Sequence, residues 1–130
     1  MSALETVKAA YAALGRNDPS VLFAAMDSNI NWIEAEGSPL ADRNPYVGPQ
    51  AVGEGVFARI LAGIDNFTVM PSTFIDGGDH VVTLGRYGGT TKAGGATLDS
   101  PFCHVWQFRG GKVVMFQQFT DTGQWTRLMA

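Results

Sequence analysis

Apolar and polar positions alternate over residues 96–121, and this pattern predicts two strands joined by a tight turn. Gly110 and Gly111 separate the two strands, and a glycine pair supplies the positive φ angles that such a turn requires. Strict alternation puts one set of side chains on the same face of this hairpin: Phe102, His104, Trp106, Phe108, Val114, Phe116, Gln118 and Thr120. The opposite face is also largely apolar, so we expect both faces to be covered.

The rest of the chain predicts helices first and further strands later. Residues 3–14 carry an apolar stripe at helical spacing, with a Ser2–Glu5 capping box at the start. Asp18 followed by Pro19 is typical of the N-cap and first turn of a second helix. The other predicted elements are a strand at 30–35, a loop at 36–50, a helix at 49–61, strands at 67–75 and 80–91, and one helical turn after residue 121.

This order of elements predicts an α+β fold in which three N-terminal helices pack on a curved, mostly antiparallel sheet. We expect the sheet to form a cone-shaped α+β barrel that encloses a pocket. Pro71 predicts an edge strand or a bulge at 67–75, because proline cannot donate a hydrogen bond to a sheet ladder. A length of 130 residues fits a single domain, 1–130, with its own hydrophobic core.

Composition and charge argue against several classes of protein. The net charge is -3 and there is no basic run, which argues against a nucleic-acid partner. No apolar run reaches membrane-spanning length, and residues 1–15 lack the pattern of a signal peptide, so we expect a cytoplasmic protein. The only cysteine, Cys103, cannot form an internal disulfide, and the two histidines lie too far apart in sequence for a recognised metal site. We therefore expect no metal and no cofactor.

Three polar residues, Glu34, His104 and Gln118, occur in strands among large apolar side chains. Glu34 shares a strand face with Trp32, which favours an interior position; a position in water at the rim of the sheet is the alternative. His104 is either a pocket residue or a core histidine bonded to a neighbouring carbonyl. Gln118 fits a pocket best, because apolar pockets orient their ligands with a few placed polar groups.

Five stretches carry a family resemblance: YAALGRNDPSVL, NINWIEA, PYVGP, VVTLGRYGG and FCHVWQFRGGKVVMFQQFTDT. Together with the order of elements, they resemble the NTF2-like superfamily and, within it, the SnoaL-like and ketosteroid-isomerase-related proteins. The resemblance covers nearly the whole chain and implies the cystatin-like cone fold. It implies no single reaction, because the superfamily includes isomerases, cyclases, dehydratases and domains that only bind or dimerise.

The resemblance also implies roles for individual residues. SNINWIE is similar to the segment that carries the carboxylate base of ketosteroid isomerases, which implies that Glu34 is the base. CHVWQF is similar to the strand that carries their oxyanion-stabilising acid, which implies that role for His104. The catalytic aspartate of SnoaL-like cyclases corresponds to Asp121, for which capping of the C-terminal turn is the alternative. The family's tyrosine on the first helix is not matched, because gap-free counting puts Ala10 there and Tyr11 one residue away.

Two functions are consistent with these observations. One is a cofactor-independent acid–base enzyme, such as an isomerase, cyclase or dehydratase, that acts on a small apolar carbonyl compound. The other is a non-catalytic binding or dimerisation module of the same fold. The predicted pocket consists of Tyr11, Trp32, Tyr46, Phe57, Phe102, Trp106, Phe116, Gln118 and Thr120. Because Met115, Gln117 and Phe119 give the sheet a half-apolar outer face, we also expect a homodimer through that face.

Overall fold

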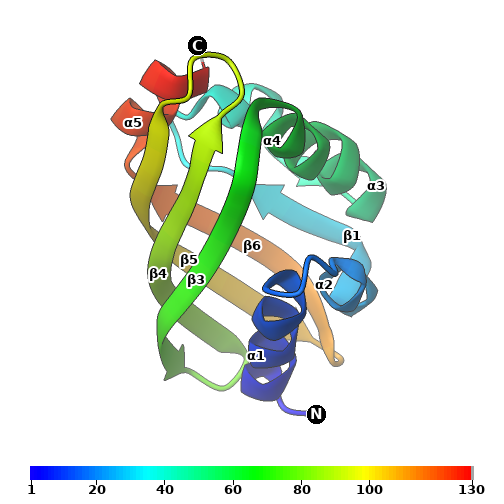
Figure 1. Cartoon of the computed structure of the whole chain (residues 1–130). Helices are drawn as coiled ribbons and strands as arrows, with labels where there is room; N and C mark the ends of the chain where they lie inside the picture. Colours follow the sequence, from blue (N-terminus) through cyan, green and yellow to red (C-terminus); the bar gives the residue numbers. More distant parts are fainter. Residues whose placement is uncertain (130) are drawn as a thin grey trace.

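A computed structural model describes residues 1–129, with helices mainly in the first half and long strands in the second (Figure 1). In chain order the elements are α1 (Ala3–Leu14), α2 (Ser20–Ala25), β1 (Met26–Ile33), the 3₁₀ helix η1 (Pro39–Arg43), β2 (Tyr46–Val47), α3 (Pro49–Val52), the π-helical turn η2 (Gly53–Phe57), α4 (Ala58–Gly63), β3 (Ile64–Asp76), β4 (His80–Thr91), β5 (Thr97–Arg109), β6 (Lys112–Thr120) and α5 (Thr122–Met129). The predicted α+β class is confirmed.

The strands form one six-stranded sheet in the order β2-β1-β6-β5-β4-β3. The β1–β6 pair is parallel and the other four pairs are antiparallel. The sheet is curved but does not close, so the expected barrel is an open sheet with β2 and β3 at its edges (Figure 1). The register of β3 also shifts between Pro71 and Thr73, so this proline lies both in an edge strand and at an irregularity.

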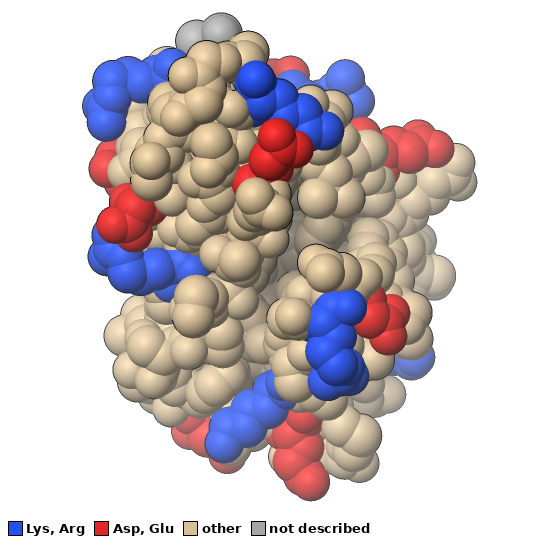
Figure 2. Space-filling model, viewed as in Figure 1, with Lys and Arg blue, Asp and Glu red and all other residues tan. Residues whose placement is uncertain are grey.

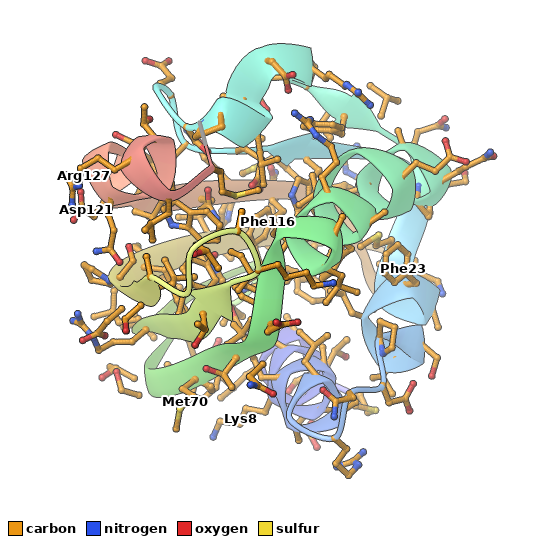
Figure 3. All side chains as sticks on the ribbon, turned by 45° about the horizontal axis from the view of Figure 1, so that its top comes forward. Lys8, Phe23, Met70, Phe116, Asp121 and Arg127 are labelled. Carbon is orange, nitrogen blue, oxygen red and sulfur yellow. The ribbon has the colours of Figure 1, made fainter. Side chains whose placement is uncertain are left out.

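The main helices cover one side of this sheet (Figure 1). α1 packs against β3 and β4, α3 against β1 and β2, and α4 against β3, while α5 packs against β5 and η1. The hydrophobic core lies between these helices and the inner face of the sheet. Figure 3 shows Phe116 in this interior, whereas Lys8 and Met70 point outward from α1 and β3.

Capping residues account for the start of the first two helices. Ser2 Oγ accepts a hydrogen bond from the Glu5 amide, and the Glu5 carboxylate accepts one from the Ser2 amide, which confirms the capping box. The second helix differs from the prediction, because Pro19 and not Asp18 is its N-cap. The Asp18 carboxylate instead accepts the Ser20 amide just inside the helix.

The predicted helix at 49–61 is present as α3, η2 and α4, and it continues to Gly63. Its middle turn is π-helical around Gly55, where the Tyr46 ring packs directly on the helix backbone. A Cβ at position 55 would lie 2.3 Å from Tyr46 Cε1, so only glycine fits there without displacing the ring. The loop predicted at 36–50 contains η1 and β2, and the tail forms the whole of α5 and not a single turn.

The β5–β6 hairpin departs from strict alternation at its turn end. The register shifts beside Phe108, which pairs with Val113. Val113 is therefore buried and Val114 only half-buried, the reverse of the sequence expectation. Nearer the middle of the hairpin, His104 pairs with Gln118 and both side chains are buried.

Charged side chains of both signs are interspersed on the face drawn in Figure 2, without a large patch of one sign. No helix within residues 1–129 is both long and apolar enough to span a membrane. The surface seen in this view therefore offers no electrostatic signal for a highly charged partner.

Candidate functional site

An internal cavity of about 40 Å³ lies between the inner face of the sheet and the helices α1, α2, η2 and α4. A water molecule needs about 10–15 Å³ by the same measure, so the space holds about three waters or a small part of a ligand. The lining residues are Tyr11, Leu14, Leu22, Trp32, Glu34, Val56, Phe57, Ile60, Phe67, Val69, Tyr87, His104, Trp106, Phe116 and Gln118. A wider surface groove between α1 and β3 adjoins the cavity, because Tyr11 and Val69 line both.

Glu34 directly follows β1, and its side chain is turned into this cavity. The residue is 2% exposed, and Trp32 Nε1 donates a hydrogen bond of 2.9 Å to Glu34 Oε2. Burial raises the pKa of the Glu34 carboxyl to about 7, an increase that the Trp32 hydrogen bond and the Arg59 charge only partly offset. A carboxyl with a pKa near neutrality can take up and release a proton at physiological pH.

The backbone at Glu34 is held from two sides. Asn44 Nδ2 donates to the Glu34 carbonyl at 2.8 Å, and Asn44 Oδ1 accepts from the Glu34 amide at 2.9 Å. The next amide along the chain, that of Ala35, donates to Gln118 Oε1 at 3.2 Å. A loop side chain and a β6 side chain therefore fix the position from which the carboxyl enters the cavity.

His104 is bonded through both ring nitrogens. Nδ1 lies 2.6 Å from the Tyr11 hydroxyl oxygen, and Nε2 lies 2.5 Å from the Tyr87 hydroxyl oxygen. Trp106 Nε1 donates to the Tyr11 hydroxyl at 3.1 Å, and Gln118 Nε2 donates to the Tyr87 hydroxyl at 2.7 Å. We call these five residues the histidine network. The alternative of a histidine bonded to a carbonyl is not observed, and direct contact with an oxyanion would require one of these bonds to break.

The histidine network is uncharged at neutral pH. Burial lowers the pKa of His104 to about 3, so its imidazole is neutral. Burial also raises the pKa of Tyr11 and of Tyr87, and the nearby Glu34 charge adds to the rise at Tyr87. These three side chains therefore offer hydrogen bonds to the cavity and no charge at neutral pH. A neutral imidazole is sufficient for such a role.

Most of the residues singled out in the sequence meet at this one cavity. Its lining includes both Glu34 and His104, together with Tyr11, Trp32, Phe57, Trp106, Phe116 and Gln118. Phe102 is not part of the lining: it lies behind His104, and the two rings stack with centroids 3.9 Å apart. Tyr46 is also outside the cavity, where its hydroxyl donates to the Leu40 carbonyl.

Two further predicted residues lie at the end of β6, away from the cavity. The Thr120 hydroxyl donates to the Pro101 carbonyl at 2.7 Å. Asp121 does not reach the cavity; it is exposed and accepts the Gln124 amide at 3.2 Å. Its carboxylate therefore caps α5, because the chain leaves the sheet at this residue and turns into the helix.

Sequence reasoning missed two residues, and it placed a third, Tyr11, in the pocket without its contact to His104. Tyr87 was not selected, although alternation along β4 puts it on the inner face with Val81 and Thr83. Asn44 carries no sequence signal, because it reaches Glu34 only through the folded loop. Tyr11, which gap-free counting displaced from the family's tyrosine position, supplies the hydroxyl that meets the imidazole.

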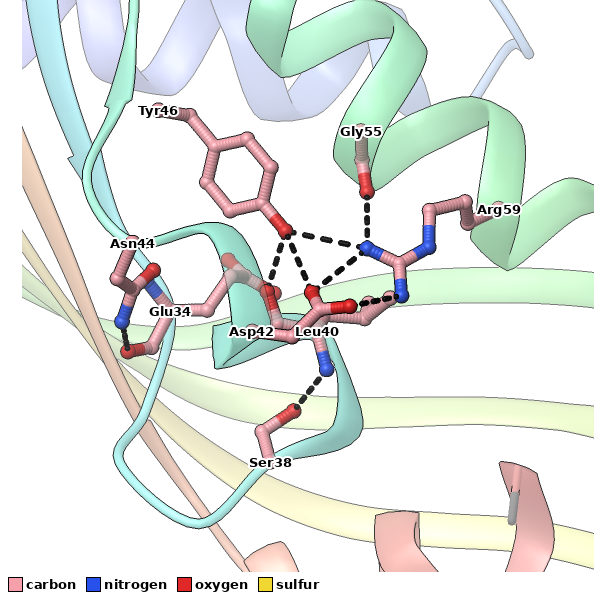
Figure 4. Close-up of polar contacts among 8 residues, drawn as sticks. All are labelled: Glu34, Ser38, Leu40, Asp42, Asn44, Tyr46, Gly55 and Arg59. Carbon is pink, nitrogen blue, oxygen red and sulfur yellow. Dashed lines mark hydrogen bonds and ion pairs between the residues drawn. The ribbon is translucent and has the colours of Figure 1, made fainter.

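A second polar cluster, which we call the rim cluster, lies outside the cavity and consists of Asp42, Tyr46 and Arg59 (Figure 4). Arg59 donates to both carboxylate oxygens of Asp42, at 2.9 and 3.0 Å. Arg59 Nη1 also donates to the Tyr46 hydroxyl and to the Gly55 carbonyl, each at 3.2 Å. The hydrogen bonds from Arg59 hold the pKa of Asp42 below its usual range.

No group of three or more His, Cys, Asp or Glu side chains within the described part of the chain is arranged to hold a metal ion. Cys103 is a free, half-buried thiol on β5, and its outward-facing position separates it from the cavity. The polar groups that line the cavity are one buried carboxyl and neutral hydrogen-bonding side chains.

A family model described as a SnoaL-like domain matches residues 7–116. The match covers most of the chain, so this protein belongs to the SnoaL-like domain family. No curated protein was found to match the sequence.

Solved structures share the fold over nearly the whole chain. An NTF2-like protein from Burkholderia thailandensis is 33% identical with a TM-score of 0.93, and the match covers 100% of this chain and 98% of the other. TerC, co-crystallised with polyporic acid, is 26% identical with a TM-score of 0.83 over 97% and 96% of the two chains. A Catenulispora acidiphila protein with a ketosteroid-isomerase-like fold, in complex with trimethylamine, is 22% identical with a TM-score of 0.77 over 96% and 92%. The NTF2-like fold is thereby confirmed.

Proposed function

We propose that the cavity binds the carbonyl end of a small, mostly apolar compound and that Glu34 removes a proton from the carbon beside this carbonyl. The electrons left by that proton move onto the carbonyl oxygen, where neutral donors of the histidine network stabilise the enolate. Return of the proton from Glu34 to another atom of the substrate completes an isomerisation, and the same first step serves a cyclisation or a dehydration. The reaction needs no cofactor.

The buried carboxyl of Glu34 is the single observation that carries this proposal. A carboxyl that is 2% exposed and held in an aromatic cavity has a pKa near neutrality because of burial, which suits a general base. The small cavity volume admits only the reacting end of a ligand, and the adjoining groove beside Val69 offers room for the remainder. The presence of polyporic acid in the crystals of TerC supports a small organic ligand.

Proton exchange at carbon provides a test that does not require the natural substrate. Small enolisable ketones such as cyclopentanone and 3-cyclohexenone are incubated with the protein in D₂O, and loss of the proton signal beside the carbonyl is followed by NMR. We expect Glu34→Gln to lose about 10²–10⁴-fold in exchange rate, the usual contribution of a general base. Glu36→Gln is the matched control, because Glu36 is exposed two residues further along the chain.

The pH dependence adds a second criterion. Because the base must be ionised, kcat/KM for exchange is expected to rise with pH and to level off above about 7, the pKa of Glu34. Exchange that persists unchanged in Glu34→Gln, or that lacks this rise, would rule out Glu34 as the base.

Ligand binding without reaction is the second candidate function. It is favoured by the histidine network, whose ring nitrogens are already satisfied by protein hydroxyls. In that case no ketone of the panel exchanges, while the wild type and Glu34→Gln bind the same small apolar ligands equally well. A protein that binds none of them would instead be a dimerisation module.

We further propose a homodimer through the outer face of β4, β5 and β6. Leu84 on β4 and Phe119 on β6 are 38% and 49% exposed on this face. Cys103 lies between them on β5 and is the cross-strand partner of each. Such a continuous apolar strip is usually covered in solution. Sedimentation at micromolar concentration should show a dimer that Phe119→Glu converts to a monomer, whereas Met70→Glu on β3 should not. A monomeric wild-type protein would contradict the proposal.

A further inference from the structure

Within the histidine network, the chain Tyr11–His104–Tyr87 holds one more proton than the two bonds of its imidazole use. Tyr11, neutral His104 and Tyr87 carry one O–H, one N–H and one O–H proton, respectively. The imidazole makes one bond to each hydroxyl, and each bond consumes one proton. One hydroxyl proton is therefore left over, and the tautomer of the imidazole decides which tyrosine retains it.

The two tautomers have opposite consequences. With the proton on Nε2, His104 donates to Tyr87 and accepts from Tyr11, so the Tyr87 proton is free. With the proton on Nδ1, the directions reverse and the Tyr11 proton is free. Trp106 and Gln118 each donate to one hydroxyl in either case, so they do not select between the tautomers.

The surroundings of the two hydroxyls differ. The Tyr87 hydroxyl accepts a hydrogen bond from the Gln118 side-chain nitrogen. The Gln118 side-chain oxygen accepts one from the Ala35 amide, which follows Glu34 in the chain. The Tyr87 hydroxyl therefore lies on the Glu34 side of the site. The Tyr11 hydroxyl instead lies beside the Trp106 indole and near the Thr83 hydroxyl, a buried group for which the structure shows no hydrogen-bond partner. A free proton on Tyr87 would be available to the cavity that Glu34 also lines, whereas one on Tyr11 would be available to the buried Thr83 hydroxyl.

We propose that neutral His104 carries its proton on Nε2 and that the free hydroxyl of Tyr87 donates to the ligand oxygen opposite Glu34. This inference rests on the proposed function for its ligand, an enolisable carbonyl compound. In the empty protein the ionised Glu34 draws the same proton toward itself, which favours the same tautomer. Tyr87 is then a catalytic hydrogen-bond donor, and His104 is a positioning residue that acts through it.

The tautomer can be measured directly in the protein with its site intact. The chain contains only two histidines, so ¹⁵N-histidine labelling of the His80→Gln protein leaves His104 as the single source of imidazole signals. His80 is on the surface in a pair with Asp79, away from the cavity. We expect long-range ¹H–¹⁵N spectra at neutral pH to show a protonated Nε2 and an unprotonated Nδ1. A protonated Nδ1 would overturn the inference.

Binding of 4-nitrophenolate, an anion whose oxygen imitates an enolate, tests the donor. Its absorbance is titrated with the Glu34→Gln protein, which lacks the competing negative charge, and with double variants that add Tyr87→Phe or Tyr11→Phe. Loss of a hydrogen bond to a charged oxygen should weaken binding about 10- to 100-fold for Tyr87→Phe. Tyr11→Phe should have the smaller effect. The reverse order would overturn the inference.

The outcomes also separate this inference from the proposed reaction. Binding that depends on Tyr87, without ketone exchange by the wild type, would defeat the reaction and support the donor role. Ketone exchange that depends on Glu34 but not on Tyr87 would support the reaction and defeat the donor role of Tyr87. If Glu34→Gln does not bind the phenolate at all, the donor role is overturned whatever the tautomer. Urea unfolding of each variant shows whether a loss reflects a disrupted fold, and the NMR result does not depend on any Tyr variant.

Discussion

The cavity and the rim cluster use similar side chains, a carboxylate near a tyrosine hydroxyl, and yet they reach opposite electrostatic states. Glu34 is 2% exposed, and burial raises its pKa to about 7. The side chain of Asp42 is 52% exposed and paired with Arg59, which lowers its pKa. A buried carboxyl with no directly bonded cation therefore has a pKa near neutrality. An exposed carboxyl bonded to an arginine is ionised at neutral pH.

This difference shows where acid–base chemistry can occur. At the rim, Arg59 would have to give up its carboxylate partner before Asp42 could accept a proton near neutral pH. In the cavity, Glu34 has the Trp32 indole as its hydrogen-bond partner, and a single proton changes its charge. In the rim cluster, Arg59 instead donates to the Tyr46 hydroxyl, and the Tyr46 ring packs on Gly55 in the helical turn beside the cavity.

The largest expected effect is the pH dependence of stability caused by His104, which becomes visible in Glu34→Gln because this variant lacks the titration of Glu34. The pKa of His104 is lowered from 6.5 in the unfolded chain to about 3 in the folded protein. The stability that depends on a neutral His104 is therefore fully present above pH 6.5 and is lost as the pH falls. Between pH 7 and pH 4 this loss is about 3 kcal/mol, at 1.36 kcal/mol per pKa unit. Glu34→Gln should therefore lose about this much in urea unfolding free energy on acidification. A pH-independent stability in this variant would contradict the buried neutral imidazole.

His104→Gln should show the opposite slope. The pKa of Glu34 is raised from 4.5 in the unfolded chain to about 7 in the folded protein. The stability that depends on a protonated Glu34 is therefore fully present below pH 4.5 and is lost as the pH rises through 7. This variant should gain slightly less than about 3 kcal/mol between pH 7 and pH 4. In the wild type the two terms nearly cancel, and its stability should change less than that of either variant. His80→Gln, altered at the exposed histidine, should behave like the wild type.

The contrast between the two clusters was only partly predictable from the sequence. Alternation within a strand is geometric, so it indicated that Trp32 and Glu34 share a face and that His104 and Gln118 face the same way. All four line the cavity. The helices, the edge position of β3 and the α+β class followed from equally local signals.

Contacts between distant segments were not predictable in this way. Tyr87 reaches His104 because of the β4–β5 register, and Asn44 reaches Glu34 through the path of the loop. The burial that sets the pKa of Glu34 also depends on every element around the cavity. Asp121 lies elsewhere for a local reason: the sheet ends one residue earlier, and α5 begins one residue later.

A smaller effect is expected from disturbing the support of the rim cluster. Gly55→Ala would place a Cβ 2.3 Å from Tyr46 Cε1, and overpacking of this kind costs about 1–3 kcal/mol. Gly53→Ala is the matched control in the same helical turn, because its Cβ would meet Phe23 Cε1 at an ordinary 3.5 Å. The control should be neutral or slightly stabilising, since alanine favours helix. Equal unfolding free energies for the two variants would contradict the tight Tyr46–Gly55 contact.

The smallest effect is expected from the ion pair of the rim cluster. Asp42→Asn removes the charge that Arg59 meets, but both side chains remain accessible to water, at 52% and 29% exposed. Solvent and salt screen such pairs, so the urea midpoint at low ionic strength should fall only slightly, and the difference from the wild type should vanish in 1 M NaCl. Glu34→Gln measured alongside should keep its pH-dependent difference at high salt, because burial and not a surface charge causes it. A salt-independent loss in Asp42→Asn would mean that the ion pair of the rim cluster is shielded from solvent, as the Glu34 carboxyl is.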